Sequence, residues 1–197
     1  MSKLKWTVGV ALLVTVTTYT MGCAGRGRQP IPQVCQPAEG ILEPGMTAAE
    51  LAGRYGVTLV VASAADAGAQ TQGTIELRPQ LESLRDVLSP AGDPLPNTTA
   101  PLYGTAEIDV EPIGAVRMGD FGSLDPERPG VLVLEQSGSI TLRLGSEANQ
   151  RGIVSFDAGY FALFVQELSE EGFAGNWASG VENRRVEGYF CAVRTGD

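Results

Sequence analysis

The chain has 197 residues, of which 43% are hydrophobic, and its formal net charge is −9. This length suits one domain with a sizeable core. Both lysines lie within the first 22 residues, and the rest of the sequence holds 12 arginines against 23 acidic residues, a net charge of −11. An acidic surface of this kind repels the phosphates of nucleic acid, so we expect no nucleic-acid partner.

The residue types that are missing exclude several kinds of active site. The chain has no histidine, and it has no lysine after residue 22. A Ser-His-Asp triad, a Cys-His pair, a Ser-Lys dyad and a Schiff-base lysine each need one of these two residues. The usual Cys/His zinc site is excluded for the same reason. We therefore expect a protein that is not an enzyme and that holds neither a cofactor nor a metal ion.

Residues 1–22 have the pattern of an export signal. A basic start precedes the apolar run 7–20, which is too short to span a bilayer comfortably as a helix. The run is followed by Gly22 and Cys23, and the whole arrangement resembles a bacterial lipoprotein signal. The resemblance implies that Cys23 is lipidated and anchors the protein to the cell envelope, at the outer membrane if the cell is Gram-negative. Ordinary secretion with cleavage after Ala24 is the alternative.

A tether and a disulfide bond are predicted after the signal. Residues 23–46 begin with a Gly-, Pro- and Gln-rich stretch, which is typical of a flexible tether. With Cys23 lipidated, Cys35 and Cys191 remain as a pair in an oxidising compartment, and we expect them to be bonded. Such a bond would tie the tether to the last predicted strand. Residues 47–197 are then a single domain.

The first half of this domain is predicted to contain two short helical pieces and three strands. Thr47 and Glu50 match a capping box, which predicts a helical turn at 47–51. Regularly spaced leucines predict a short amphipathic helix at 80–88. Alternating apolar residues predict the strands, and prolines or polar residues predict the loops. These strands are 53–61, 74–78 and 102–110, and the two long loops are 89–101 and 118–130.

The second half has the pattern of an antiparallel meander. Its predicted strands are separated by connections short enough for hairpins. We expect an all-β fold in which the meander forms a closed or nearly closed barrel of eight to nine strands, with a sandwich as the alternative. Closure is favoured because it removes exposed strand edges. The predicted strands are 131–136, 139–147, 152–157, 159–168, 173–179 and 185–194.

Residues at the two ends of the domain resemble those of the calycin group, which includes lipocalins and avidin-type barrels. Gly53-Arg54-Tyr55 follows the predicted helical turn, and Arg194 lies on the last strand. In lipocalins the corresponding aromatic residue packs at the barrel floor and the arginine covers its face. The resemblance therefore implies a cation–π contact between Tyr55 and Arg194.

Six aromatic residues, together with Arg194, are candidates for lining a ligand cavity or for closing the barrel. Core packing is the ordinary role of aromatic residues at strand spacing. An eight-stranded barrel either fills its interior with side chains or holds one small ligand, and the sequence leaves both open. The aromatic candidates are Tyr55, Tyr103, Tyr160, Phe164, Trp177 and Phe190.

Acidic residues offer two further kinds of chemistry. Glu107 and Asp109 share one face of a predicted strand, and on an inward face they could act as paired carboxylates. Asp120, Asp125 and Glu127 could supply oxygen ligands to calcium, although their spacing matches no standard loop. Solvent exposure is the ordinary state of both groups.

These observations predict a cell-envelope lipoprotein with a non-catalytic binding barrel. Its partner would be a small apolar ligand inside the barrel or another envelope protein, with the membrane reached through the N-terminal lipid. The alternative is a structural lipoprotein with a filled barrel, whose loops 89–101 and 118–130 contact a partner. A third and less favoured hypothesis is a carboxylate-dependent hydrolase that acts on envelope polysaccharide.

Overall fold

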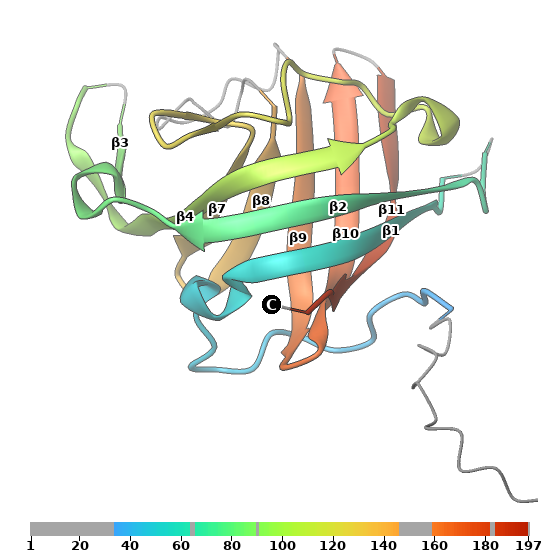
Figure 1. Ribbon diagram of the computed structural model, residues 1–197, viewed down its shortest axis with the longest axis horizontal. Coiled ribbons are helices and arrows are strands. Elements are labelled where there is room, and N and C mark those ends of the chain that lie inside the picture. The colour runs from blue at the N-terminus through green and yellow to red at the C-terminus, as the bar shows by residue number, and fades with distance from the viewer. Residues whose placement is uncertain (1–33, 64–65, 90, 146–158, 182–183, 197) are drawn as a thin grey trace, which may run out of the picture. The chain divides into compact units, whose positions relative to one another are not determined.

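Eight antiparallel strands close into a barrel, and one short strand extends the sheet outside it (Figure 1). The computed structural model describes residues 34–63, 66–89, 91–145, 159–181 and 184–196. The all-β prediction is confirmed, because the helical pieces among these residues are single 3-10 turns. No helix in the described part has the length and hydrophobicity that crossing a membrane requires.

The barrel strands follow one another around the wall in sequence order, and the last pairs with the first. They are β1 (Gly53–Val61), β2 (Gln70–Pro79), β4 (Pro94–Ile108), β7 (Val131–Gln136), β8 (Ser139–Leu144), β9 (Tyr160–Ser169), β10 (Gly172–Val181) and β11 (Arg184–Arg194). The remaining elements are β3 (Asp86–Leu88), β5 (Leu124–Asp125), β6 (Arg128–Pro129), η1 (Ala48–Leu51), η2 (Glu82–Leu84) and η3 (Glu111–Ile113).

Alternation along the strands sets which side chains fill the barrel. In β1, Tyr55, Val57 and Leu59 point inward and are almost completely buried. Arg54 lies between them in the sequence and faces outward, because successive side chains of a strand point to opposite faces. The same alternation in the other strands builds one continuous apolar core inside the barrel.

The helical piece predicted at 80–88 is confirmed only as a single 3-10 turn at Glu82–Leu84. The chain forms the single turn η2 and then the strand β3, which pairs with the first half of β4. The leucine spacing was misleading, since Leu81 and Leu88 are 55% and 37% exposed. The buried residue of this stretch is Val87, which packs in a small second cluster between β3 and the outside of the barrel.

The loop predicted at 89–101 is wrong in its second half, because β4 already begins at Pro94. Prolines usually exclude a central strand, since they lack an amide donor. Here Pro94 is the first residue of its strand, and Pro101 lies where the pairing of β4 with β7 shifts register. The strand expected at 152–157 lies outside the described residues.

Candidate functional site

The aromatic residues singled out in the sequence divide between the inside and the outside of the barrel. Tyr55, Trp177 and Phe190 are buried in the core. Phe164 points outward from β9 and is 42% exposed. Three of the candidates therefore do not line the interior, because they alternate with the inward-facing residues of their strands. These three are Tyr103, Tyr160 and Phe164.

One end of the barrel, which we call the floor, is sealed by Arg194. Its guanidinium carbon lies 4.9 Å from the centre of the Tyr55 ring, so the cation–π contact implied by the calycin resemblance is present. The same guanidinium donates hydrogen bonds to the carbonyl oxygens of Ala52 at 2.9 Å and Glu50 at 3.2 Å. A third bond, 3.3 Å long, runs to the carbonyl of Glu170. Arg194 thus joins η1 to the β9–β10 turn.

Gly53 makes room for this seal. Its φ of +142° lies where residues with a side chain are strained. A Cβ atom at this position would also collide with the Nη1 atom of Arg194. The glycine that opens the Gly53-Arg54-Tyr55 motif is therefore required by the arginine at the other end of the domain.

Aromatic rings occupy the interior above the floor. The rings of Tyr55 and Phe173 meet edge to face with their centres 4.9 Å apart, and Phe173 meets Phe190 at 5.7 Å. The Tyr55 hydroxyl is buried and has no hydrogen-bond partner. Burial raises the pKa of this phenol above its ordinary value, while the charge of Arg194 opposes part of that effect.

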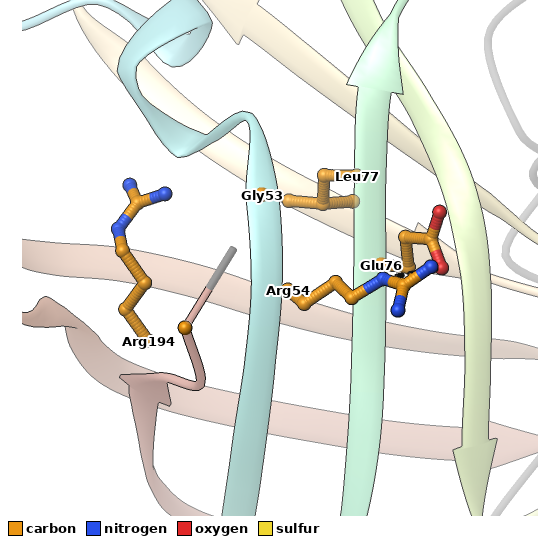
Figure 2. Close-up of a pocket in the computed structure, with 6 residues that line it drawn as sticks. Gly53, Arg54, Glu76, Leu77 and Arg194 are labelled. Atoms are coloured by element: carbon orange, nitrogen blue, oxygen red, sulfur yellow. Dashed lines mark ion pairs between the residues drawn. The ribbon is translucent and has the colours of Figure 1, made fainter.

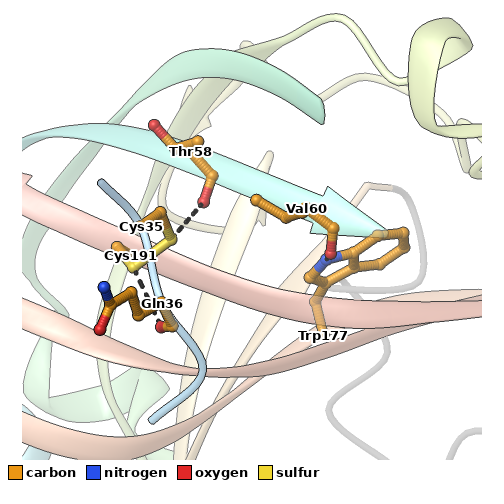
Figure 3. The surroundings of a disulfide bond; sticks show 6 residues. All are labelled: Cys35, Gln36, Thr58, Val60, Trp177 and Cys191. Atoms are coloured by element: carbon orange, nitrogen blue, oxygen red, sulfur yellow. Dashed lines mark hydrogen bonds between the residues drawn. A yellow bond between two sulfur atoms is a disulfide. The ribbon is translucent and has the colours of Figure 1, made fainter. Parts of the chain in front are cut away.

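A second group of rings lies at the opposite end. Phe161 is in contact with both Phe121 and Trp177, with ring centres 5.8 Å apart in each pair. The indole nitrogen of Trp177 donates a hydrogen bond of 3.1 Å to the carbonyl of Val60 (Figure 3). Gly188 of β11 permits this reach, because a Cβ there would lie only 2.8 Å from the indole nitrogen.

This second end is covered by residues 110–118, which we call the covering segment. The segment follows β4, includes η3, and crosses the upper end of the barrel in Figure 1. It forms no strand, and its own residue Ile113, at the end of η3, is completely buried. The end is thus closed by a segment outside the sheet.

Hydrogen bonds to side chains of β10 and β11 help to fasten the covering segment to the barrel wall. The amide of Val116 donates to the Ser179 hydroxyl at 2.9 Å, and Ser179 is itself buried on β10. Arg184 of β11 donates to the carbonyl of Gly114 at 3.1 Å from an exposed position. These contacts differ from those of the floor, where one guanidinium binds three carbonyls.

Phe121, beyond the covering segment, is firmly fixed. Its carbonyl accepts hydrogen bonds from the Ala106 amide at 2.7 Å and the Thr105 hydroxyl at 2.9 Å. The guanidinium of Arg117 lies 4.8 Å from the centre of its ring. The polar loop predicted at 118–130 therefore contains a core residue, which its composition concealed.

An outer groove runs along β1 and β2. It consists of two adjoining pockets of about 390 and 280 Å³, which share Arg54 and Glu76. Figure 2 shows the larger of the two pockets. Glu76 forms ion pairs with Arg54 at 3.1 Å and with Arg78 at 2.6 Å. Hydrogen bonding from Arg78 lowers the pKa of Glu76, so this carboxylate is unsuited to donate a proton.

The acidic residues considered for catalysis or calcium binding are exposed. Glu107 borders the smaller pocket on the outside of β4, and no inward pair is formed with Asp109. Asp109, Asp120 and Asp125 each accept a hydrogen bond from the amide two residues further on, which stabilises local turns. Among the residues that the structure describes, no group of three or more acidic or cysteine side chains is placed to hold a metal ion.

The disulfide bond between Cys35 and Cys191 is formed, as predicted (Figure 3). It joins the N-terminal segment to the outer face of β11, with the two Cα atoms 5.6 Å apart. Further along, the amides of Glu39 and Gly40 donate to one carboxylate oxygen of Glu167 on β9, at 2.9 and 2.8 Å. Cys23 lies outside the described residues.

Sequence reasoning missed the residues that close the covered end. Phe161 alternates with Leu163 in a predicted strand, so that pattern could have identified it as inward-facing. Ser179 gave no such signal, because a serine at the end of an apparent strand is typical of a turn. Ile113 was hidden for a similar reason, since it stands alone between Pro112 and Gly114.

Comparison with known proteins adds little to this description. No protein-family model matches the chain. No curated protein matches it either. Among solved structures, that of EF1p2_mFAP2b bound to DFHBI is similar to it, with 13% sequence identity and a TM-score of 0.36 over 75% of this chain and 96% of that one. A likeness of this degree establishes neither a shared ligand nor a family.

Proposed function

We propose that this protein is an exported, lipid-anchored protein of the bacterial cell envelope, and that its barrel binds a small apolar molecule without catalysing a reaction. The signal-like N-terminus with Cys23 supports the anchor. The lack of histidine, and of lysine after residue 22, supports a role other than catalysis. The apolar interior of the barrel, with its aromatic rings, suits an apolar ligand.

The observation that carries this proposal is the difference between the two ends of the barrel. The floor is held by Arg194, which bonds three carbonyls and covers Tyr55. The covered end is closed by residues 110–118, which contribute no strand and are fastened through Ser179 and Arg184. We infer that a ligand enters at the covered end, because the segment that closes it is not a strand of the barrel wall.

The energetic cost of moving the covering segment is within the range of ligand binding. Exposing Val110 and Ile113, the buried apolar residues of the segment, costs about 2–3 kcal/mol each. Losing the bonds to Ser179 and Arg184 costs about 1 kcal/mol each. An apolar ligand that covers Phe161 and Trp177 in place of the segment recovers the part of this cost that comes from exposing apolar surface. The described structure is thus the closed form of the binding site.

Titration with toluene tests the proposal. The chain from Ala24 onward contains the compact unit 34–197 and a single tryptophan, Trp177. In nitrogen-15 NMR spectra we expect saturable shifts of the Val116 amide and the Trp177 indole signal. Ile113→Ala should strengthen binding about tenfold, because less apolar surface is exposed when the segment moves.

Phe164→Ala is the matched control for this titration. Phe164 lies outside the barrel on the same strand as Phe161, so its removal should leave toluene affinity unchanged. Shifts that grow linearly with toluene and do not saturate, in the unchanged protein and in Ile113→Ala alike, would contradict the ligand-binding function.

The lipid anchor needs a separate experiment. Mass spectrometry of the protein from native membranes should show a mature chain that begins with acylated Cys23. A chain that begins at Gly25 would contradict the anchor and leave the barrel's ligand binding as a separate question.

The outer groove favours a second candidate function, the binding of an envelope protein. Its two pockets adjoin along β1 and β2, and Arg54 is 65% exposed beside them. A photoreactive residue in place of Thr74, which lines the groove, should then cross-link one partner in intact cells. The same residue in place of Thr141, on the far strand β8, should not.

A further inference from the structure

Ser179 places a hydroxyl group in the apolar interior of the covered end. It lies on the inward face of β10 with Trp177, and it is paired across the sheet with Phe161 of β9. Its side chain is 1% exposed. A hydroxyl buried among apolar groups is unfavourable unless it has a hydrogen-bond partner.

The partner of this hydroxyl belongs to the covering segment. The Val116 amide donates to the Ser179 oxygen at 2.9 Å. When residues 110–118 move to admit a ligand, Ser179 loses that partner while it stays on the rigid strand β10. Leaving a buried polar group unsatisfied is costly. A serine hydroxyl can donate as well as accept, so the bound ligand can restore the lost bond either by donating to the Ser179 oxygen or by accepting its proton.

The neighbouring polar group at this end is already engaged. The Trp177 indole nitrogen donates to the Val60 carbonyl, and Gly188 keeps that path open. The Tyr55 hydroxyl lies on the floor beneath Arg194, at the opposite end of the interior. The wall beneath the covering segment therefore combines aromatic surface with the Ser179 hydroxyl, which becomes available when the segment moves, and Thr71 of β2 is a further buried hydroxyl residue of the described barrel.

We propose that the ligand is an uncharged, mainly apolar molecule with a single hydrogen-bonding group, such as a ketone, an ester or an alcohol, which pairs with Ser179. This inference rests on the proposed ligand-binding function. A charged group is disfavoured at this depth, because burial beside Phe161 and Trp177 removes its water, while the guanidinium groups of Arg117 and Arg184 at this end are exposed to solvent and screened by it.

Three probes of similar size test this chemistry. Toluene carries no polar group, acetophenone carries a neutral acceptor, and benzoate carries a charge. Calorimetric titration of the chain from Ala24 onward should show acetophenone binding about tenfold more tightly than toluene, and benzoate more weakly than either. In Ser179→Ala the advantage of acetophenone over toluene should disappear.

Arg184→Gln separates recognition from the fastening of the covering segment. Both Ser179→Ala and Arg184→Gln remove one bond to this segment, so both should bind toluene more tightly than the unchanged protein. Only Arg184→Gln retains the hydroxyl, and it should keep the tenfold preference for acetophenone. Circular dichroism confirms that both variants are folded.

The outcomes distinguish this inference from the function on which it rests. If toluene and acetophenone bind equally to the unchanged protein, the inference is wrong and ligand binding stands. If the preference for acetophenone persists in Ser179→Ala, Ser179 is not the recognising group and the inference is wrong. If benzoate binds most tightly, the ligand is charged. If no probe binds to any variant, the proposed function fails as well.

Discussion

Tyr55 and Arg194 show how two residues far apart in the sequence form one structural unit. The barrel places the Arg194 guanidinium over the Tyr55 ring and directs its donors to the carbonyls of Glu50 and Ala52. The contact depends on Gly53, whose missing side chain leaves space for the guanidinium.

At the residue scale we predict that Tyr55→Phe stabilises the protein, most strongly at alkaline pH. At neutral pH the variant loses a buried hydroxyl without a hydrogen-bond partner, so we expect a gain of about 1 kcal/mol in the free energy of unfolding. Urea unfolding of both proteins measures this difference.

The pH dependence of this substitution follows from the raised pKa of Tyr55. Above about pH 10, the unfolded chain releases the phenol proton while the folded protein retains it. The unchanged protein therefore loses stability as pH rises through this range, and Tyr55→Phe lacks that loss. A constant stability difference between pH 8 and pH 11 would contradict the assignment.

At the scale of the elements, burial decides which pattern a segment follows. Residues 80–88 carry leucines at helical spacing, yet Val87 is the residue that the fold buries, through β3. Pro94 and Pro101 predict a loop, yet β4 accommodates both at its start and at a shift of register. Both errors arise where the first half of β4 extends beyond its pairing with β2.

We predict that Gly188→Ala disrupts the hairpin of β10 and β11. An added Cβ would collide with the Val60 carbonyl and lie 2.8 Å from the Trp177 indole nitrogen. The expected loss is about 2–3 kcal/mol in the free energy of unfolding, as for overpacked cores. Thermal unfolding and the emission wavelength of Trp177 measure the effect.

Gly56→Ala is the matched control for that substitution. Gly56 lies on β1, and a Cβ there would make an ordinary contact of 3.5 Å with Thr195. The free energy of unfolding of this variant should fall by less than about 1 kcal/mol, since the only change is the different backbone preference of alanine and glycine. Equal destabilisation by both substitutions would show that the Trp177 contact is unimportant.

At the scale of the whole molecule, two kinds of link connect the last strand to the beginning of the domain. Hydrogen bonds join β11 to β1, and the disulfide bond attaches the N-terminal segment to β11. The disulfide spans 156 residues of sequence. Because a cross-link restricts the unfolded chain more as its loop lengthens, this bond stabilises the protein by about 5 kcal/mol in the chain-entropy model.

Cys191→Ser should therefore lower the melting temperature by about 10–15 °C. Cys35→Ser should have the same effect, and the double variant should be no less stable than either single variant, because all three lack the same bond. Differential scanning calorimetry without reductant compares them. Losses that add up in the double variant would show that each cysteine acts through its own contacts.

The sequence by itself determined the class of fold, favoured a barrel over a sandwich and indicated the disulfide pair, and the calycin resemblance implied the contact of Tyr55 with Arg194. These depend on local alternation, on cysteine parity and on a short motif at the chain ends. The tertiary structure alone decided which aromatic rings lie inside, how β3 and β4 pair, and that Ile113 and Ser179 meet at the covered end. Such features depend on contacts between distant strands, and a single residue at a turn or strand end carries no periodicity from which its direction could be predicted.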